Sequence, residues 1–223
     1  MSLGRKMAAE AIGTMLLLTA VVGSGIMGDR LSGGNPALAL LANSIATGAA
    51  LIAIILAFGG ISGAHLNPVV TLASASQRRM ELGEAGGYVL AQLAGAFTGV
   101  AAAHAMFNEP LFAFSTHVRA GTTQMFSEFL ATFGLLSVIW GCSRYHARMV
   151  PFAVGAYIAG AYWFTSSTSF ANPAVTAARA FTNTFSGIRP ADAPAFVVAQ
   201  IVGAFAATVF WSWLFAGSKG ETQ

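Results

Sequence analysis

Long stretches of this chain contain no charged residue, and these stretches limit what it can fold into. Charged side chains make up 9% of the chain, whereas soluble domains carry about 25%. An ionised side chain is costly inside a bilayer, and a helix needs about 20 apolar residues to cross one. We therefore expect an integral membrane protein that contacts the lipid bilayer. The runs without Asp, Glu, Lys or Arg are 11–28, 31–77, 85–108, 129–143, 149–178 and 193–218.

The same scarcity of charge excludes several other classes of protein. Intrinsic disorder and nucleic-acid binding both require a charge density that this chain lacks, so no nucleic-acid partner is expected. The single cysteine, Cys142, excludes a disulfide framework and a cysteine-based zinc cluster. The histidines at 104, 117 and 146 are scattered along the chain. We expect neither a metal nor a cofactor.

The charge-free runs predict six membrane-spanning helices. Runs 31–77 and 149–178 are too long for one span, so each contains a helix followed by a shorter apolar segment with an Asn-Pro pair. A cleaved signal peptide over residues 1–28 is an alternative for the first helix, disfavoured because this segment has a counterpart later in the chain. The predicted spans are 7–28, 37–59, 82–106, 121–143, 149–167 and 192–216.

The chain contains two related halves. Ala-Gln-Leu-Ala-Gly-Ala-Phe at 91–97 recurs as Ala-Gln-Ile-Val-Gly-Ala-Phe at 199–205. Glu10 and Glu128 each lie early in a helix, and the Asn-Pro pairs follow in the same order. Three spans per half is an odd number, so the halves enter the membrane from opposite sides. We expect one transmembrane domain over 1–223, with inverted repeats at about 1–108 and 119–217.

Basic residues are more frequent on one side of the predicted topology. Cytoplasmic loops are enriched in Lys and Arg, so both termini are predicted to be cytoplasmic in a multi-pass protein of the cell inner (plasma) membrane. The side with both termini collects seven basic residues: Arg5, Lys6, Arg78, Arg79, Arg144, Arg148 and Lys219. The other side has four: Arg30, Arg119, Arg179 and Arg189.

Each Asn-Pro pair is typical of a helix start. Asn is a favoured N-cap and Pro a favoured first helical residue, which predicts short helices over about 68–77 and 173–182. The irregular segments before them are tolerated at membrane depth only when buried in protein or lining a water-filled cavity. Two positive helix ends and two Asn amides then meet at the membrane centre. Neutral hydrogen-bonding solutes can cross such a centre, whereas cations and protons are repelled.

The sequence resembles the aquaporin or major intrinsic protein family over nearly its whole length. The resemblance implies an all-α membrane protein, a right-handed bundle of six transmembrane helices plus two half-helices. It also implies a homotetramer with one pore per subunit and a passive channel for small uncharged polar solutes, not an enzyme. The matching elements are Ala9-Glu10, residues 61–71 from Ile61 to Thr71, residues 87–92 from Gly87 to Gln92, Ser127-Glu128, and Asn172-Pro173-Ala174-Val175.

The resemblance also assigns roles to individual residues. Asn67-Pro68-Val69 and Asn172-Pro173-Ala174 correspond to the paired pore motifs, with Val69 where the family usually has Ala. Glu10 and Glu128 would accept backbone N–H groups from the two irregular segments. His65 matches a pore-side histidine. A solvated position at the helix end stays open for Glu10, and a packed loop position for His65.

The chain departs from the family after the second motif, where the usual Arg is Val175. Motif distances place the other constriction positions at Thr47, Gly160 and Ser169, with a slip of one turn left open for Thr47 and Gly160. Four small, uncharged residues predict a wide opening without Arg. Arg179 lies one turn later and is expected to point elsewhere. The pattern resembles a bacterial aquaglyceroporin branch linked to arsenic resistance, and predicts water, glycerol and arsenite or methylated arsenicals as solutes.

Other functions stay open at this point. A strict water channel would share every motif. A secondary transporter also uses inverted repeats and broken helices, but none of the eight acidic residues lies within ten positions of Asn67 or Asn172 to bind a coupling ion. A membrane enzyme would need a catalytic constellation that neither Asn-Pro segment offers beyond His65. A purely structural role would require an occluded pore.

Overall fold

The computed structural model describes residues 1–216, and all regular structure in this part of the chain is helical. Residue 217, the expected end of the second repeat, and Lys219, counted in the topology, lie outside the described residues. The elements are α1 (Leu3–Leu31), α2 (Pro36–Ser62), α3 (Pro68–Ser76), α4 (Leu82–Phe107), α5 (Thr122–Tyr145), η1 (Ala147–Met149), α6 (Val150–Phe164), α7 (Pro173–Arg179) and α8 (Ala193–Ala216).

Five of these helices are long and apolar enough to cross a membrane: α1, α2, α4, α5 and α8. The helix in the fifth predicted span, 149–167, is shorter than expected. Helix α6 has 15 residues, about 22 Å at 1.5 Å per residue, against about 30 Å of hydrocarbon. It ends at Phe164, where Thr165 Oγ1 bonds back to the carbonyl of Ala161 at 2.6 Å and the chain enters the second irregular segment.

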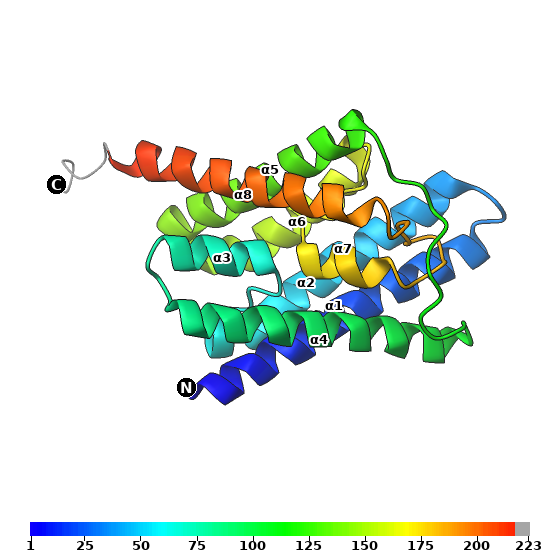
Figure 1. The fold of residues 1–223 in the computed structure, drawn as a ribbon, viewed down its shortest axis with the longest axis horizontal. Helices are drawn as coiled ribbons and strands as arrows, with labels where there is room; N and C mark the ends of the chain where they lie inside the picture. The colour runs from blue at the N-terminus through cyan, green and yellow to red at the C-terminus, as the bar shows by residue number, and fades with distance from the viewer. Residues whose placement is uncertain (217–223) are drawn as a thin grey trace.

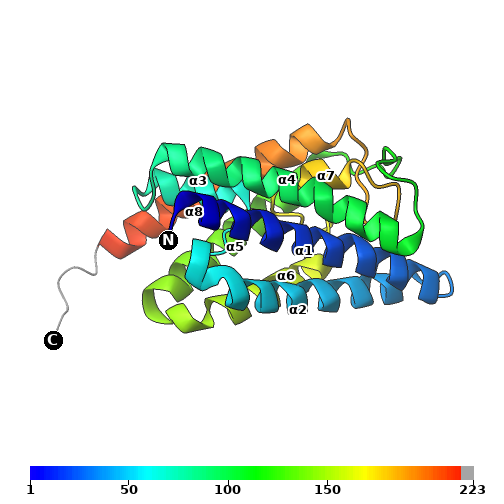
Figure 2. The same cartoon turned by 90° about the horizontal axis from the view of Figure 1, so that it is seen from below.

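The two short helices lie between the long helices α4 and α8 and contact both (Figure 1). Helix α1 packs on α2 and α4, α5 packs on α8 and α6, and α3 contacts α7 between them. The start of α1 and the end of α8 lie at the same end of the bundle in both views (Figures 1 and 2). We call this the proximal end, and the end crossed by the 108–121 connection the distal end. From the centre, α3 runs toward the proximal end and α7 toward the distal end.

The short helices are slightly shorter than the sequence predicts. Helix α3 ends at Ser76, one residue before the expected end. Helix α7 ends at Arg179, three residues early. The chain turns back after α7, because Ile188 N donates to the carbonyl of Arg179 at 3.2 Å.

Two glycines of the repeated Ala-Gln-x-x-Gly motif allow the long helices to pack closely. A Cβ atom on Gly95 of α4 would collide with the carbonyl of Ala11 on α1. A Cβ atom on Gly203 of α8 would collide with the carbonyl of Phe129 on α5. Small residues permit such backbone contact between helices in membranes. The close packing places the Gln of each motif beside the segment that it supports.

Candidate pore

Asn67 and Asn172 cap the two short helices. The Oδ1 atom of Asn67 accepts a hydrogen bond from Val69 N at 3.1 Å. The Oδ1 atom of Asn172 accepts from Ala174 N at 3.0 Å and from Val175 N at 3.3 Å. Pro68 and Pro173 are the first helical residues. Both helix starts therefore form by the local chemistry of an Asn cap followed by Pro.

The two caps also bind each other's segments. Asn67 Nδ2 donates to the carbonyl of Ala171, and Asn172 Nδ2 donates to the carbonyl of Leu66, both at 2.8 Å. This exchange holds the starts of α3 and α7 together. An Asn amide carries two hydrogens, so each side chain keeps a second N–H for a molecule in the cavity that both line.

Glu10 of α1 holds the first irregular segment. Its Oε1 accepts from Ser62 Oγ at 2.6 Å and from His65 N at 2.9 Å. Its Oε2 accepts from Leu66 N at 2.7 Å and from Gln92 Nε2 at 2.8 Å. Glu10 is fully buried and not a solvated helix-end residue. Four donors provide the hydrogen bonding that a buried charge requires.

Glu128 of α5 holds the second segment in the same way. Its Oε1 accepts from Ser167 Oγ at 2.6 Å and from Phe170 N at 2.8 Å. Its Oε2 accepts from Ala171 N at 2.9 Å and from Gln200 Nε2 at 2.6 Å. Glu128 is also fully buried. The two carboxylates thus make equivalent contacts in the two halves of the chain.

The irregular segments adopt backbone conformations that need this support. Ala64, Leu66, Ser169 and Ala171 have φ values of 46°, 52°, 51° and 47°, a left-handed region that is unfavourable for residues other than glycine. Each such residue costs on the order of 1 kcal/mol. The conformation brings two successive N–H groups to one carboxylate in each segment, which keeps the segments in place along the cavity.

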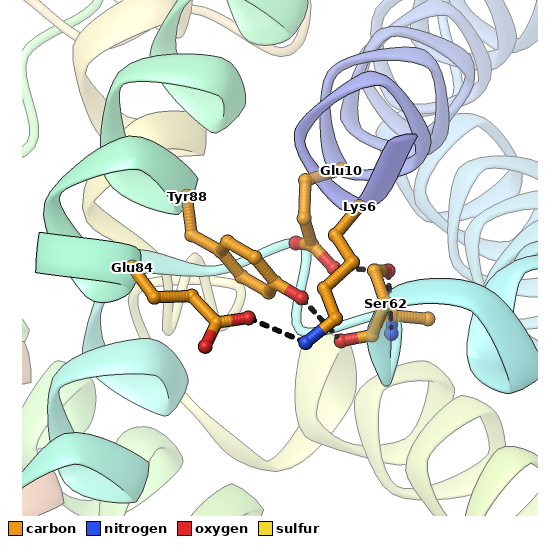
Figure 3. A network of polar contacts seen from close by, with 6 residues as sticks. Lys6, Glu10, Ser62, Glu84 and Tyr88 are labelled. Carbon is orange, nitrogen blue, oxygen red and sulfur yellow. Dashed lines mark hydrogen bonds and ion pairs between the residues drawn. The ribbon is translucent and has the colours of Figure 1, made fainter. Parts of the chain in front are cut away.

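A second layer of contacts surrounds the first irregular segment at the proximal end. Lys6 Nζ lies 2.7 Å from Glu84 Oε1, and Tyr88 Oη donates to the carbonyl of Ser62 at 2.9 Å (Figure 3). His65 lies beside this cluster: its ring packs edge-on against Tyr88, and its Nδ1 lies 3.1 Å from Thr71 Oγ1. His65 therefore both lines the cavity and packs against its neighbours.

One cavity of about 370 Å³ connects these features. At the proximal end its lining includes Lys6 and Glu84, and at the centre it includes Asn67 and Asn172. At the distal end its lining includes Arg179. The cavity thus follows the axis of the bundle past both Asn side chains.

The distal part of the cavity differs from the expected filter at one position. Thr47, Ser169 and Val175 line the cavity, whereas Gly160 lies on the exposed face of α6. The placement of Gly160 in the filter is therefore wrong. Tyr162, two residues later and about 200° further round the helix, lines the cavity instead. At this level the side chain that α6 contributes to the cavity lining is thus aromatic.

Arg179 also differs from the expectation. It lines the cavity and is 2% exposed, although it was expected to point elsewhere. Residues four apart share one face of a helix, so Arg179 lies on the same side of α7 as Val175. Its guanidinium carbon lies 3.4 Å from the centre of the Phe170 ring, and its Nε donates to the carbonyl of Ser186. The cavity therefore contains a guanidinium, one turn beyond the position usual in the family.

A tether at the distal end holds the 108–121 connection beside this arginine. Asp192 Oδ2 accepts from Arg119 N at 2.9 Å, and Asp192 Oδ1 accepts from Arg189 Nη2 at 2.7 Å. Burial raises the pKa of the Asp192 carboxyl, but these hydrogen bonds outweigh it and hold the pKa below its ordinary value. Asp192 is therefore a carboxylate at neutral pH.

Several supporting residues were not identified from the sequence. Gln92 and Gln200 belong to the repeated motif, but no role followed from the repeat alone. Each donates to a buried Glu and to a Thr of the adjacent short helix, Thr71 at 3.0 Å and Thr176 at 2.8 Å. The available signal was their recurrence in the same motif after each Asn-Pro pair, 25 positions after Asn67 for Gln92 and 28 positions after Asn172 for Gln200. The serines that bind the two Glu side chains, Ser62 and Ser167, are 105 positions apart, the same separation as the two Asn-Pro pairs.

Two half-helices that meet around a continuous cavity define an all-α membrane channel. Comparison with known proteins gives the family. The Major intrinsic protein family profile matches residues 1–159. The aquaglyceroporin AqpS of Rhizobium meliloti is 53% identical over 217 residues, which cover 97% of this chain and 93% of AqpS. The chain belongs to the major intrinsic protein family and is a passive channel rather than an enzyme.

More distant relatives agree with this assignment. Aquaporin NIP6-1 of Arabidopsis thaliana is 32% identical over 161 residues, which cover 70% of this chain and 52% of the plant protein. The X-ray structure of the aquaglyceroporin from Plasmodium falciparum matches with a TM-score of 0.76 at 22% identity, covering 97% of this chain and 98% of that one. The latter likeness extends the fold assignment over both short helices.

Proposed function

We propose that this chain conducts water and glycerol through a pore centred on Asn67 and Asn172. The cavity that runs past both Asn side chains is the observation that carries the proposal. A solute hydroxyl can accept from the free N–H of each amide there, and can donate to carbonyls of the irregular segments. The positive ends of α3 and α7 oppose cations at the same point. In this reading Glu10 and Glu128 position the two segments.

The proposal extends to the neutral hydroxide of trivalent arsenic. Arsenous acid is uncharged at pH 7 and resembles glycerol in size and hydrogen bonding, and methylated arsenicals are a further candidate. We propose a filter formed by Thr47, Ser169, Val175 and Tyr162, with Tyr162 in the place first assigned to Gly160. A strict water channel is the alternative for this filter.

The proposal also covers the arrangement in the cell. A homologous bacterial aquaglyceroporin supports a place in the inner membrane. The excess of Lys and Arg at the proximal end supports cytoplasmic termini. We further propose a single domain built from inverted repeats, assembled as a homotetramer with one pore per subunit.

Stopped-flow light scattering on proteoliposomes tests the proposed conduction. Water and glycerol permeabilities above those of empty vesicles are expected, and arsenite uptake can be measured in the same vesicles. Flux that rises linearly with the gradient and ignores a protonophore is expected of a channel. Saturating flux that collapses with the protonophore would instead indicate a secondary transporter. Water permeability without glycerol permeability would indicate the strict water channel.

A further inference from the structure

A groove lies on the surface between α5 and α8, near the proximal end. Ser137, Gly141 and Tyr145 line it from α5, and their spacing of four residues places them on one face of that helix. Trp211 lines it from α8. Trp140, one residue before Gly141, lines the pore cavity instead. The groove is therefore separate from the solute path.

Two polar atoms in the groove lining are enclosed but have no hydrogen-bond partner among residues 1–216. They are Ser137 Oγ and Trp211 Nε1. The hydroxyl groups of Thr132, Thr208 and Ser212 on the same two helices each bond to the carbonyl one turn earlier. A buried donor without an acceptor is costly, and an indole N–H can only donate. The two atoms therefore favour a ligand that supplies acceptor oxygens.

The depth of these atoms limits the source of the acceptors. Ser137 precedes the last residue of α5 by eight positions, and Trp211 precedes the last described residue of α8 by five. These separations are about 12 Å and 8 Å along the helix axes. Both atoms thus lie below the proximal helix ends, within one leaflet of the membrane. A molecule with hydrocarbon chains can enter this depth, whereas a small soluble anion is excluded from it.

The proximal rim of the groove is basic and aromatic. The guanidinium carbon of Arg144 lies 5.3 Å from the centre of the Phe215 ring, and that ring lies 5.0 Å from the Trp211 ring. Neither 129–150 nor 193–216 contains an acidic residue. Basic residues at the membrane surface attract anionic lipids, so the rim complements a negatively charged headgroup.

We propose that this groove binds one anionic phospholipid of the proximal leaflet. Its two ester carbonyls accept from Trp211 Nε1 and Ser137 Oγ, and its phosphate lies at Arg144. One acyl chain lies along Val138, which also lines the groove. The Trp211 ring can lie against α5 because Gly141 has no side chain, and a Cβ atom there would lie 3.0 Å from the ring. The site is a lipid site apart from the pore.

Quenching of tryptophan fluorescence by dibrominated lipids in proteoliposomes tests the site. The Trp163→Phe/Trp213→Phe variant keeps Trp211 and Trp140, and Trp140 is 3% exposed, so quenching by lipid reports on Trp211. Half-maximal quenching is expected at about tenfold less phosphatidylglycerol than phosphatidylcholine, equivalent to about 1.4 kcal/mol. Equal quenching by the two lipids would overturn the site. Quenching by neither would also overturn it, and would indicate that a second copy of the chain covers the groove.

A reciprocal variant is the matched control. In Trp163→Phe/Trp211→Phe the reporter is Trp213, which is 69% exposed on α8, and both lipids should quench it equally. The same preference for phosphatidylglycerol at Trp213 would indicate general enrichment of anionic lipid around the protein, and would overturn the site. Soluble glycerol phosphate should not relieve the quenching of Trp211, and relief would assign the groove to a soluble anion instead.

Two further comparisons test the residues of the site. Arg144→Gln should abolish most of the preference at Trp211, whereas Arg5→Gln, which removes an exposed cation on α1 at the same end, should leave it unchanged. Equal effects of the two changes would contradict a phosphate site at Arg144. If a fluorescence variant does not fold, thermal unfolding of the wild type gives a second measurement. Phosphatidylglycerol should raise the midpoint more than phosphatidylcholine, and Ser137→Ala should reduce this gain; equal midpoints with both lipids would overturn the proposal.

Discussion

The buried Glu128 carboxylate offers the sharpest test of what holds the pore segments in place. It accepts four hydrogen bonds, two of them from the backbone N–H groups of Phe170 and Ala171. Glu128→Gln keeps the shape of the side chain but turns one acceptor oxygen into an NH2 group. Whichever way the new amide is oriented, one of these two N–H groups faces a donor, and the backbone cannot turn away.

The expected loss of stability follows from these contacts. A buried donor left without an acceptor costs about 1–3 kcal/mol, and the bonds that remain lose their charge assistance. Burial of an amide in place of a carboxylate costs less desolvation, which offsets part of this loss. If the Gln200 amide flips, its oxygen can accept a hydrogen bond from the new NH2 group, but Gln200 then loses its hydrogen bond to Thr176. The flip also leaves the backbone N–H of Phe170 or Ala171 without its acceptor. We expect a net loss of about 2 kcal/mol.

Unfolding in mixed detergent micelles, followed by tryptophan fluorescence, measures this loss. Glu81→Gln is the control, because it makes the same chemical change at an exposed position. Glu81 precedes α4, and its side chain makes no cap hydrogen bond. This variant should shift the free energy of unfolding by less than about 0.5 kcal/mol. Glu10→Gln should behave like Glu128→Gln, because its contacts are equivalent. Equal unfolding midpoints for the Glu128 and Glu81 variants would refute the idea that the Glu128 carboxylate holds the second irregular segment in place.

Three further changes test the distal half of the cavity. Val175→Arg should reduce glycerol and arsenite uptake more than water uptake, since a second guanidinium narrows the path; equal loss of all three in a well-folded protein would contradict this filter position. Arg179→Gln should raise potassium leak, measured as a diffusion potential, because the repulsion between the guanidinium and a cation about 5 Å away is worth about 3 kcal/mol at an effective dielectric constant near 20. Arg179→Lys keeps the positive charge and should still exclude potassium. Equal leak from both variants would argue against a charge barrier. Asp192→Asn should lower thermal stability by about 1–2 kcal/mol at pH 7. The pKa of Asp192 is lowered on folding. Its contribution to stability is therefore complete above the pKa of the unfolded state, near 3.9, and fades as the pH falls through the pKa of the folded state. A stability difference between wild type and Asp192→Asn that persists unchanged at pH 3 would contradict the carboxylate role.

The sequence alone determined the features that depend on local chemistry and on hydropathy. Charge-free runs fixed the membrane class, because lipid excludes ionised side chains wherever they lie in the fold. The Asn-Pro pairs fixed where α3 and α7 begin, because an Asn cap and the fixed φ of Pro act on the next few residues only. The order of Glu10, Glu128 and the two Asn-Pro pairs fixed the pairing of the two halves.

Only the tertiary structure decided which side chains of α6 and α7 face the cavity. A helix in a membrane is apolar on its lipid side and on its packed side, so hydropathy carries no signal for the rotation of α6. The close contact between Gly48 and Gly155 restricts that rotation, and in the folded protein Tyr162 lines the cavity whereas Gly160 does not. Arg179 similarly acquires its position from Phe170 and Ser186, partners that the chain reaches only after folding.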